Sequence, residues 1–170
     1  MVKRRSLAET TCPIGRSLDV IGDWWTLLIV RNALHGARRF SEFQKQLGIS
    51  KSMLAQRLQK MVRTGLLEVR PDPEGSAYGE YHLTEKGRRL HTVLMALRQW
   101  GEGHLFEPGE PMTVLTDARD GAPARPLQLL SADGRVLGHE DTRIVQGEAT
   151  DVPKARLAAS EPSSVEGAAR

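Results

Sequence analysis

The stretch SEFQKQLGISKSMLAQRLQKMVRT, residues 41–64, decides the fold of this 170-residue chain. Apolar residues recur at helical spacing on both sides of Gly48, which predicts two short helices joined by a tight turn. We expect Ser41 to cap the first helix, with Gln44 at the capping-box spacing, and Ser50 to cap the second. Gly65 would end the second helix.

The second of these helices has no acidic residue. The side chains outside its apolar stripe are all neutral or basic: Ser50, Lys51, Ser52, Gln56, Arg57, Gln59, Lys60 and Arg63. A solvated helix of this length usually mixes signs, so this face indicates a helix that lies in the major groove of DNA. The alternative is a basic, solvent-exposed helix with no role in DNA binding.

The segments around the helix pair complete a winged helix-turn-helix, a mainly α fold with a small β-wing. Leu66–Pro71 and Glu80–Leu83 are predicted strands, separated by a loop with Pro and Gly. Two helices are expected upstream, one from Pro13 to Ile21 and one over residues 24–34 that Asp23 caps. The second is apolar nearly all round and should be the buried centre. Thr84 should cap a long last helix that ends near Phe106.

Base contacts are expected from the N-terminal end of the reading helix, and phosphate contacts from basic residues around it. Ser50, Lys51, Ser52 and Gln56 are the base-edge candidates. Arg38, Arg39 and Arg63 are better placed for phosphates. Ser41, Arg57 and Lys60 complete the contacts expected from the helix pair.

Charge divides the chain into two parts. Residues 1–106 hold 17 Lys/Arg and 10 Asp/Glu, whereas residues 107–170 hold 7 and 11, so only the front part attracts a polyanion such as double-stranded DNA. We expect an N-terminal arm at 1–11, the DNA-binding domain at 12–106 and a linker at 107–111. A small β-rich extension with turns at 119–121 and 132–134 should fill 112–147, followed by a disordered tail at 148–170.

Several classes of function are excluded by what the sequence lacks. It has neither a secretory signal nor the roughly 20 apolar residues of a membrane span, so we expect a cytoplasmic protein without membrane contact. The single cysteine, Cys12, rules out an intrachain disulfide and a multi-cysteine zinc site. The histidines show no metal-ligand spacing, and no nucleophile motif or carboxylate pair is present. We therefore expect no enzyme activity, no cofactor and no metal.

Motifs spread over residues 12–106 resemble the HxlR-type, MarR-like family of bacterial winged helix-turn-helix regulators. In chain order they are CP (12–13), LDVIGDWWTLLI (18–29), RFSEF (39–43), ISKSMLAQRL (49–58), GLLE (65–68) and YHLTEKG (81–87). The resemblance implies a homodimer that binds an inverted-repeat operator through two symmetric reading helices. It also implies dimer contacts through the first and last helices of the domain. Independently, the long last helix carries more apolar surface than a small domain needs.

This chain departs from the family pattern in the wing and in the tail. The wing loop reads AYGE at 77–80, where relatives carry Pro-Pro and a basic residue, and Arg70 is the only basic residue nearby. We therefore expect Tyr78 or the wing backbone to contact phosphate, rather than an arginine in the minor groove. In the tail, SADG at 131–134 resembles a Cys-x-x-Cys-Gly knuckle without its cysteines, so no metal follows. The extension would pack on the core, cover a pocket or bind another protein.

Two features suggest how a signal could release the DNA. Cys12 sits where several family members place a sensing thiol, and both nearby Arg16 and a helix N-terminus favour the reactive thiolate. The alternative to a sensing role is that Cys12 is a small, half-buried residue at the dimer interface. Trp24 and Trp25 are candidates for a small hydrophobic effector's pocket, although core packing is the interpretation we favour. The expected function is a repressor that blocks a promoter. The rivals are a protein-interaction module that has lost DNA binding and a thiol sensor that cross-links its dimer.

Overall fold

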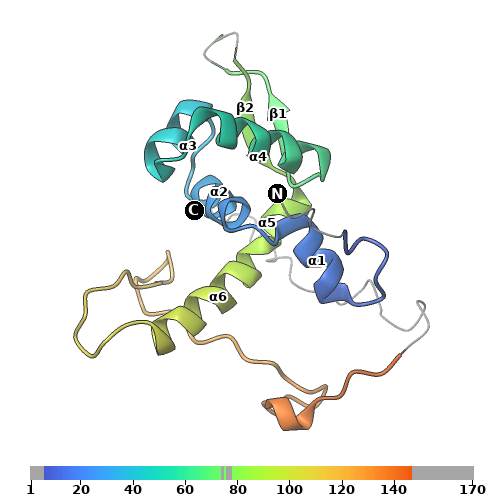
Figure 1. The fold of residues 1–170 in the computed structure, drawn as a ribbon. Helices are drawn as coiled ribbons and strands as arrows, with labels where there is room; N and C mark the ends of the chain where they lie inside the picture. The colour runs from blue at the N-terminus through green and yellow to red at the C-terminus, as the bar shows by residue number, and fades with distance from the viewer. Residues whose placement is uncertain (1–5, 74, 76–77, 147–170) are drawn as a thin grey trace, which may run out of the picture. The chain divides into compact units, whose positions relative to one another are not determined.

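The computed structural model describes residues 6–73, 75 and 78–146 of the chain. The order of elements is α1 (Pro13–Ile21), α2 (Trp24–Leu34), α3 (Phe40–Leu47), α4 (Lys51–Arg63), β1 (Leu67–Arg70), β2 (Glu80–Leu83), α5 (Glu85–Arg88), α6 (Leu90–His104) and the 3-10 turn η1 (His139–Asp141) (Figure 1). This mostly helical fold with one small antiparallel sheet confirms the predicted winged helix-turn-helix. The chain forms two compact units, and the division between them falls after Leu127.

Helix α2 is the centre of the first unit, as its apolar composition predicts. Ile29 and Val30 are fully buried, and residues of α3 and α4 pack around them as one core. The expectation that the whole helix is buried is wrong at Trp24, which is 68% exposed, while Trp25 packs on the core. At 100° per residue, Trp24 lies on the side of the helix opposite Thr26, which belongs to the buried face.

Helix caps follow the sequence at three of four places. Asp23 accepts the Thr26 N–H at 3.0 Å, and Ser50 and Thr84 cap α4 and α5 in the same way. The start of α3 differs, since the helix begins at Phe40 and its cap residue is Arg39 instead of Ser41.

The side chain of Glu42 explains the earlier start of α3. Its carboxylate accepts the backbone N–H groups of Arg38 and Arg39 at 2.7 and 2.9 Å, which satisfies donors that the first turn would leave free. These same hydrogen bonds favour the ionised form and hold the pKa of Glu42 below its ordinary value. A carboxylate at the third helical position therefore replaces the serine cap.

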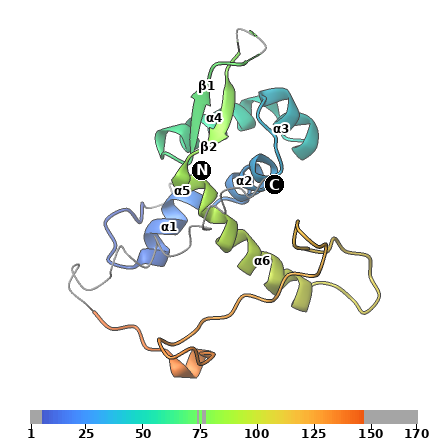
Figure 2. The same ribbon diagram turned by 180° about the vertical axis from the view of Figure 1, so that it is seen from behind.

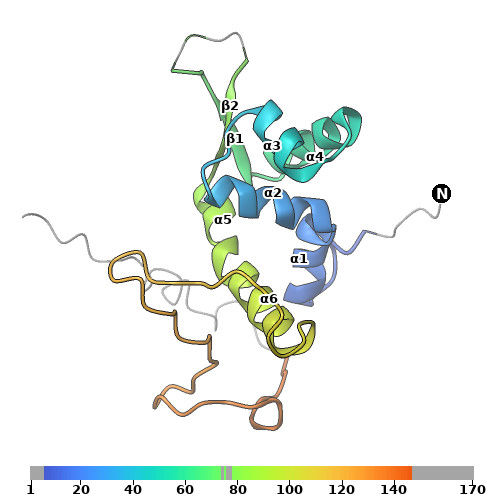
Figure 3. The ribbon, with the colours of Figure 1, turned by 90° about the vertical axis from the view of Figure 1, so that its left-hand side faces the viewer.

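The wing is a hairpin of two four-residue strands, and one further backbone contact supports it. β1 and β2 pair in antiparallel register from Leu67↔Leu83 to Arg70↔Glu80. The Tyr81 N–H also donates to the Arg38 carbonyl at 2.8 Å, so the segment before α3 extends the hairpin on its other edge. Turned views show the hairpin projecting beyond α3 and α4 (Figures 2 and 3).

The predicted single last helix is interrupted. Arg89 separates α5 from α6, and α5 is held close to the sheet by Gly87. A Cβ at Gly87 would lie 2.2 Å from the Leu66 carbonyl oxygen and 2.9 Å from Leu83 Cδ2. Only a glycine lets the backbone of α5 approach the end of the sheet this closely.

In its described residues, 112–146, the extension contains turns but not the expected short strands. In place of the strands expected over 112–147, this part has two isolated bridges, Thr116↔Pro123 and Leu130↔Val136. Prolines in this segment lack the N–H that a longer ladder requires. The predicted turns are present, with Gly121 and Gly134 at φ of 73° and 87°.

The two ends of the chain were expected to be an arm and a disordered tail. The predicted disordered tail at 148–170 lies outside the described residues. Of the arm at 1–11, the described part is held on α1, because the Leu7 N–H donates to Asp19 Oδ1 at 2.9 Å. Within the described part of the chain, no helix combines the length and apolar character that crossing a bilayer requires.

The close approach at Gly87 leads to a stability prediction. Gly87→Ala should lower the free energy of unfolding by about 1–3 kcal/mol, because the new methyl overlaps a backbone oxygen. Gly103→Ala is the matched control in α6, where nothing lies within 4 Å of the added atom. That change should raise the free energy of unfolding by up to about 1 kcal/mol. Urea unfolding measures both, and effects of the same sign would contradict the packing described.

Candidate nucleic-acid interface

The outward face of α4 is set by its buried face. Leu54, Leu58 and Met61 are completely buried at helical spacing, which turns the opposite side of the helix to solvent. That side carries the exposed residues Ser52, Gln56, Gln59 and Arg63. In the described part of the chain, no hydrogen bond or ion pair engages the last three side chains. The helix thus presents two amides and a guanidinium with unused donors.

Gln59 is a candidate that the expected contact set omitted. It lies three residues after Gln56 and four before Arg63, on the same exposed stripe. The reasoning from sequence favoured the N-terminal end of the helix and stopped at Gln56. Helical periodicity counted from Gln56 would have included Gln59.

Ser50 and Lys51, at the N-terminal end of α4, differ in whether their side chains are already engaged. The Ser50 hydroxyl already accepts the Met53 N–H at 3.4 Å and lies 3.4 Å from the Ser52 hydroxyl, so capping occupies it. Lys51 is exposed, with no ion pair among the described residues. Of the two, Lys51 is the more available to an anion.

A groove joins this end of α4 to α3 and the wing. Its volume is about 700 Å³, and its lining consists of Arg39, Phe40, Ser41, Gln44, Lys51, Val69, Asp72, Tyr78, Gly79 and Tyr81. Tyr78 is 84% exposed, and Ser41 and Lys51 are exposed as well. Four residues predicted to contact DNA, namely these three and Arg39, therefore line one groove although they come from distant parts of the sequence.

Arg38 and Arg39 are engaged inside the protein. The Arg38 guanidinium donates to the carbonyls of Ala33 and Ala37 at 2.6 and 2.9 Å, at the end of α2. Arg39 lies 3.1 Å from Asp72 and 3.6 Å from Glu80, on either side of the wing loop. Asp72 is almost completely buried, so this ion pair anchors the wing to the start of α3. Sequence reasoning missed Asp72 and Glu80, because no local pattern links them to Arg39.

Arg57 and Lys60 point from α4 towards α1 and α2. Arg57 Nε lies 3.3 Å from Asp23 Oδ1, and Lys60 Nζ lies 3.9 Å from Asp23 Oδ2. Lys60 also donates to the Asp19 carbonyl at 3.2 Å. The carboxylate that caps α2 therefore also attracts two cations of α4. Both cations lie away from the exposed stripe.

Arg70, the one basic residue of the wing strands, pairs with its neighbour. Its guanidinium donates to Glu68 at 2.9 Å through Nε, and both side chains are about half exposed. An exposed pair of this kind exchanges readily with solvent. Arg70 can thus leave Glu68 for another anion at little cost.

Cys12 and the two tryptophans do not form a shared site. Cys12 is exposed at the start of α1, where its sulfur accepts the Gly15 N–H at 3.5 Å. The side chain of Arg16 donates to the Thr10 carbonyl at 2.6 Å. The ring centroids of Trp24 and Trp25 lie 4.8 Å apart with the rings tilted at 41°, and neither residue lines either of the cavities described for this chain. Over the described residues, no three potential metal ligands cluster.

Helices α1 and α6 both expose apolar side chains. On α1 these are Ile14 and Leu18, and on α6 they are Val93, Leu97 and Trp100, which recur at helical spacing. All five are at least 44% exposed in the single chain. These are the two helices that were expected to form a dimer.

Known proteins share the family and the fold of this chain. A family model described as HxlR-like helix-turn-helix matches residues 20–108. An uncharacterised HTH-type transcriptional regulator of Mycobacterium tuberculosis is 36% identical over 147 residues, which cover 86% of this chain and 91% of that protein. The crystal structure of PA1607, described as a transcription factor, superposes with a TM-score of 0.81 at 45% identity, covering 84% of this chain and all of the other. The reduced form of the transcriptional regulator YodB from Bacillus subtilis has a TM-score of 0.50 at 32% identity, covering 59% and 100%.

The Asp23 contacts predict energetic coupling between α2 and α4. Asp23→Asn keeps an oxygen that can cap α2 but removes the charge that faces Arg57, so it should cost about 1–2 kcal/mol of unfolding free energy. In a double-mutant cycle, Asp23→Asn combined with Arg57→Gln should cost less than the sum of the single changes. Urea unfolding of the four proteins measures the coupling. Strictly additive losses would show that the pair does not hold the two helices together.

Proposed function

The chain belongs to the HxlR-like helix-turn-helix family, and from this membership we propose that it is a transcriptional regulator that binds an inverted-repeat operator as a homodimer. In this proposal it represses transcription by occupying a promoter. The observation that carries the proposal is the exposed stripe of α4, on which the side chains of Gln56, Gln59 and Arg63 have no hydrogen bond or ion pair among the described residues.

The chemistry of the stripe suits base recognition. The side-chain amide of a glutamine can make two hydrogen bonds to adenine: its N–H donates to N7, and its oxygen accepts from the N6 amino group. Gln56 and Gln59 offer two such amides within one turn of the helix, with Ser52 on the same side. We therefore assign base contacts to these residues and expect adenine within each half-site.

Phosphate contacts are assigned to the exposed groups that flank the stripe. Arg63 lies at the end of α4, while Lys51, Ser41 and Tyr78 line the groove next to the wing. Arg70 can join them by leaving Glu68. Arg38, Arg39, Arg57 and Lys60 stay in the role of holding the interface in place, because each already has partners inside the protein.

The homodimer is supported by the apolar side chains of α1 and α6. Ile14, Leu18, Val93, Leu97 and Trp100 leave a surface that one chain cannot bury. Pairing two copies through these helices would remove that surface from water and present two reading helices. Half-sites one helical turn apart would lie about 34 Å from each other.

Binding to duplex DNA at varied salt tests the proposal. Genomic fragments selected by the protein should yield a duplex that binds two chains, with an affinity that falls linearly with salt on a log–log plot. Arg63→Gln should reduce the slope by about 1.8, which is about 0.9 for each of the two copies in the dimer, whereas Arg119→Gln, which removes a cation outside the interface, should leave it unchanged. Gln56→Ala or Gln59→Ala should cost about 1–3 kcal/mol on the selected site only.

Two outcomes would overturn the proposal. A folded dimer that binds no duplex at low salt would favour a protein-interaction module on the same fold. Leu97→Glu should yield chains that no longer bind the operator in pairs. If chains that carry Leu97→Glu still bind the operator in pairs, then α6 is not the dimer helix.

A thiol sensor is the second candidate, favoured by the exposure of Cys12 on α1. Because α1 is one of the two proposed dimer helices, oxidation there would act on the dimer. Cys12→Ser should bind the operator as the wild type does and should lose any release by hydrogen peroxide. Gel-shift titration with and without peroxide compares the two proteins, and a response that survives the substitution would make Cys12 structural.

A further inference from the structure

Residues 112–127 form a hairpin that is fastened to α6. The Ala124 N–H donates to the Leu115 carbonyl at 3.0 Å and the Asp117 N–H to the Ala122 carbonyl at 2.8 Å, on either side of the Thr116↔Pro123 bridge. This hairpin follows the segment that the family model matches, and it belongs to the same compact unit as α6.

The two ends of the hairpin are held by adjacent residues of α6. Arg98 donates to the Thr113 hydroxyl at 3.0 Å and also to the Thr113 carbonyl. The Gln99 amide receives the Leu127 N–H at 2.7 Å and donates to the Leu127 carbonyl at 3.3 Å. Both ends of a 15-residue segment are thus anchored one residue apart on the helix.

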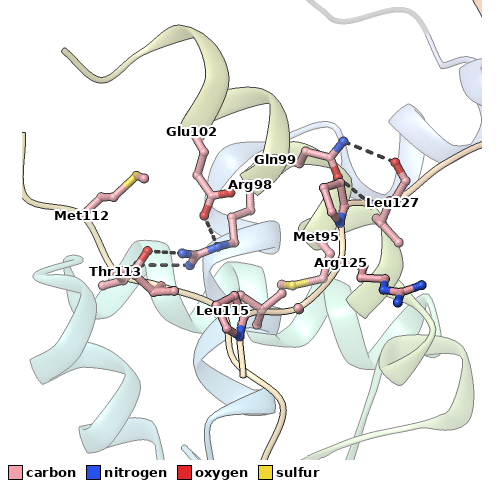
Figure 4. Close-up of a pocket in the computed structure, with 13 residues that line it drawn as sticks. Met95, Arg98, Gln99, Glu102, Met112, Thr113, Leu115, Arg125 and Leu127 are labelled. Carbon is pink, nitrogen blue, oxygen red and sulfur yellow. Dashed lines mark hydrogen bonds and ion pairs between the residues drawn. The ribbon is translucent and has the colours of Figure 1, made fainter. Parts of the chain in front are cut away.

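A cavity of about 220 Å³ lies between the hairpin and α6 (Figure 4). Its walls come from Met95, Arg98, Gln99 and Glu102 on the helix and from the hairpin segments 112–115 and 123–127. The volume is below that of a drug-sized site, and the cavity is therefore suited to a small molecule.

The three polar side chains that α6 contributes to these walls are already paired, either with each other or with the hairpin. Arg98 Nε lies 2.5 Å from Glu102 Oε1, although not in hydrogen-bond alignment, and the rest of its guanidinium is used by Thr113. Both ends of the Gln99 amide are used by Leu127. Figure 4 shows the Arg125 guanidinium directed away from Met95 and Leu115. Among the α6 side chains of the wall, a charged ligand would find no free counter-charge.

What remains for a ligand is apolar and adaptable surface. Met112, Leu115 and Leu127 are each more than a third exposed, although they surround the cavity. Two of the lining residues, Met95 and Met112, are methionines, whose flexible thioethers fit varied shapes and make favourable contacts with aromatic rings.

We propose that the cavity between α6 and the 112–127 hairpin binds a small, uncharged aromatic molecule. The ligand would bridge the helix and the hairpin, covering apolar surface on both. Because it binds only the docked hairpin, it would stabilise that arrangement. The proposal concerns ligand binding and holds whether or not the chain binds the operator proposed above.

Toluene is a suitable probe, and the methionine methyl groups report its position. With the methyl carbons labelled, the NMR signals of Met95 and Met112 should shift and saturate as toluene is added. Met53 on the exposed side of α4 and Met61 in the core provide internal references, and their signals should stay in place. Trypsin cleavage after Arg119 should also become slower, because the occupied hairpin stays docked.

Variants separate a specific site from general apolar binding. Leu115→Trp should fill the cavity and abolish the shifts, whereas Leu130→Trp, outside the cavity, should leave them unchanged. Benzoate, of similar size but charged, should not saturate the site. The proposal is overturned if toluene shifts neither Met95 nor Met112, if all four methionines respond alike, or if the response survives Leu115→Trp.

Discussion

The burial of one face of α4 against α2 and its neighbours is the constraint on which the rest of the structure depends. Leu54, Leu58 and Met61 have no exposed surface, and they share one core with Ile29 and Val30. A helix fixed along three points of its length cannot rotate, so the residues of its opposite face are fixed too. The direction of the polar side chains is thus a consequence of apolar packing. The ion pairs at Asp23 act on top of this packing and hold the same helix from its flank.

Helix α6 shows how one helix can carry separate tasks on separate faces. Leu94 belongs to the core, while Val93, Leu97 and Trp100 remain exposed. The side of the helix that carries Arg98 and Gln99 is covered by the hairpin. With 3.6 residues per turn, the exposed apolar set lies away from Arg98 and Gln99, whereas Arg98, four residues after Leu94, lies next to the core side of the helix. A contact on one side can therefore change without altering the residues on another.

Sequence reasoning succeeded where the determining interactions are local. Periodicity placed α4 and the wing, and the caps at Asp23, Ser50 and Thr84 were expected from residue type. Sequence reasoning was less successful where a residue far away in the sequence determines the contact. The pairing of Arg39 with Asp72, or of Arg57 with Asp23, spans more than thirty residues and leaves no local pattern. The start of α3 was misplaced because Glu42 accepts the N–H groups of Arg38 and Arg39, so the helix begins ahead of Ser41. In the extension, turn residues were recognised, but turns alone do not supply enough backbone pairing to form strands.

The attachment of the hairpin through Arg98 and Gln99 has a consequence for how such a chain can evolve. The side chains of Arg98 and Gln99 on α6 hold the two ends of residues 112–127, and neither belongs to the core. A gene could therefore gain or lose this module through changes in the codons for residues 112–127 and at two codons within α6. The DNA-reading half would be inherited intact, and the added segment would be free to diversify under a different selection.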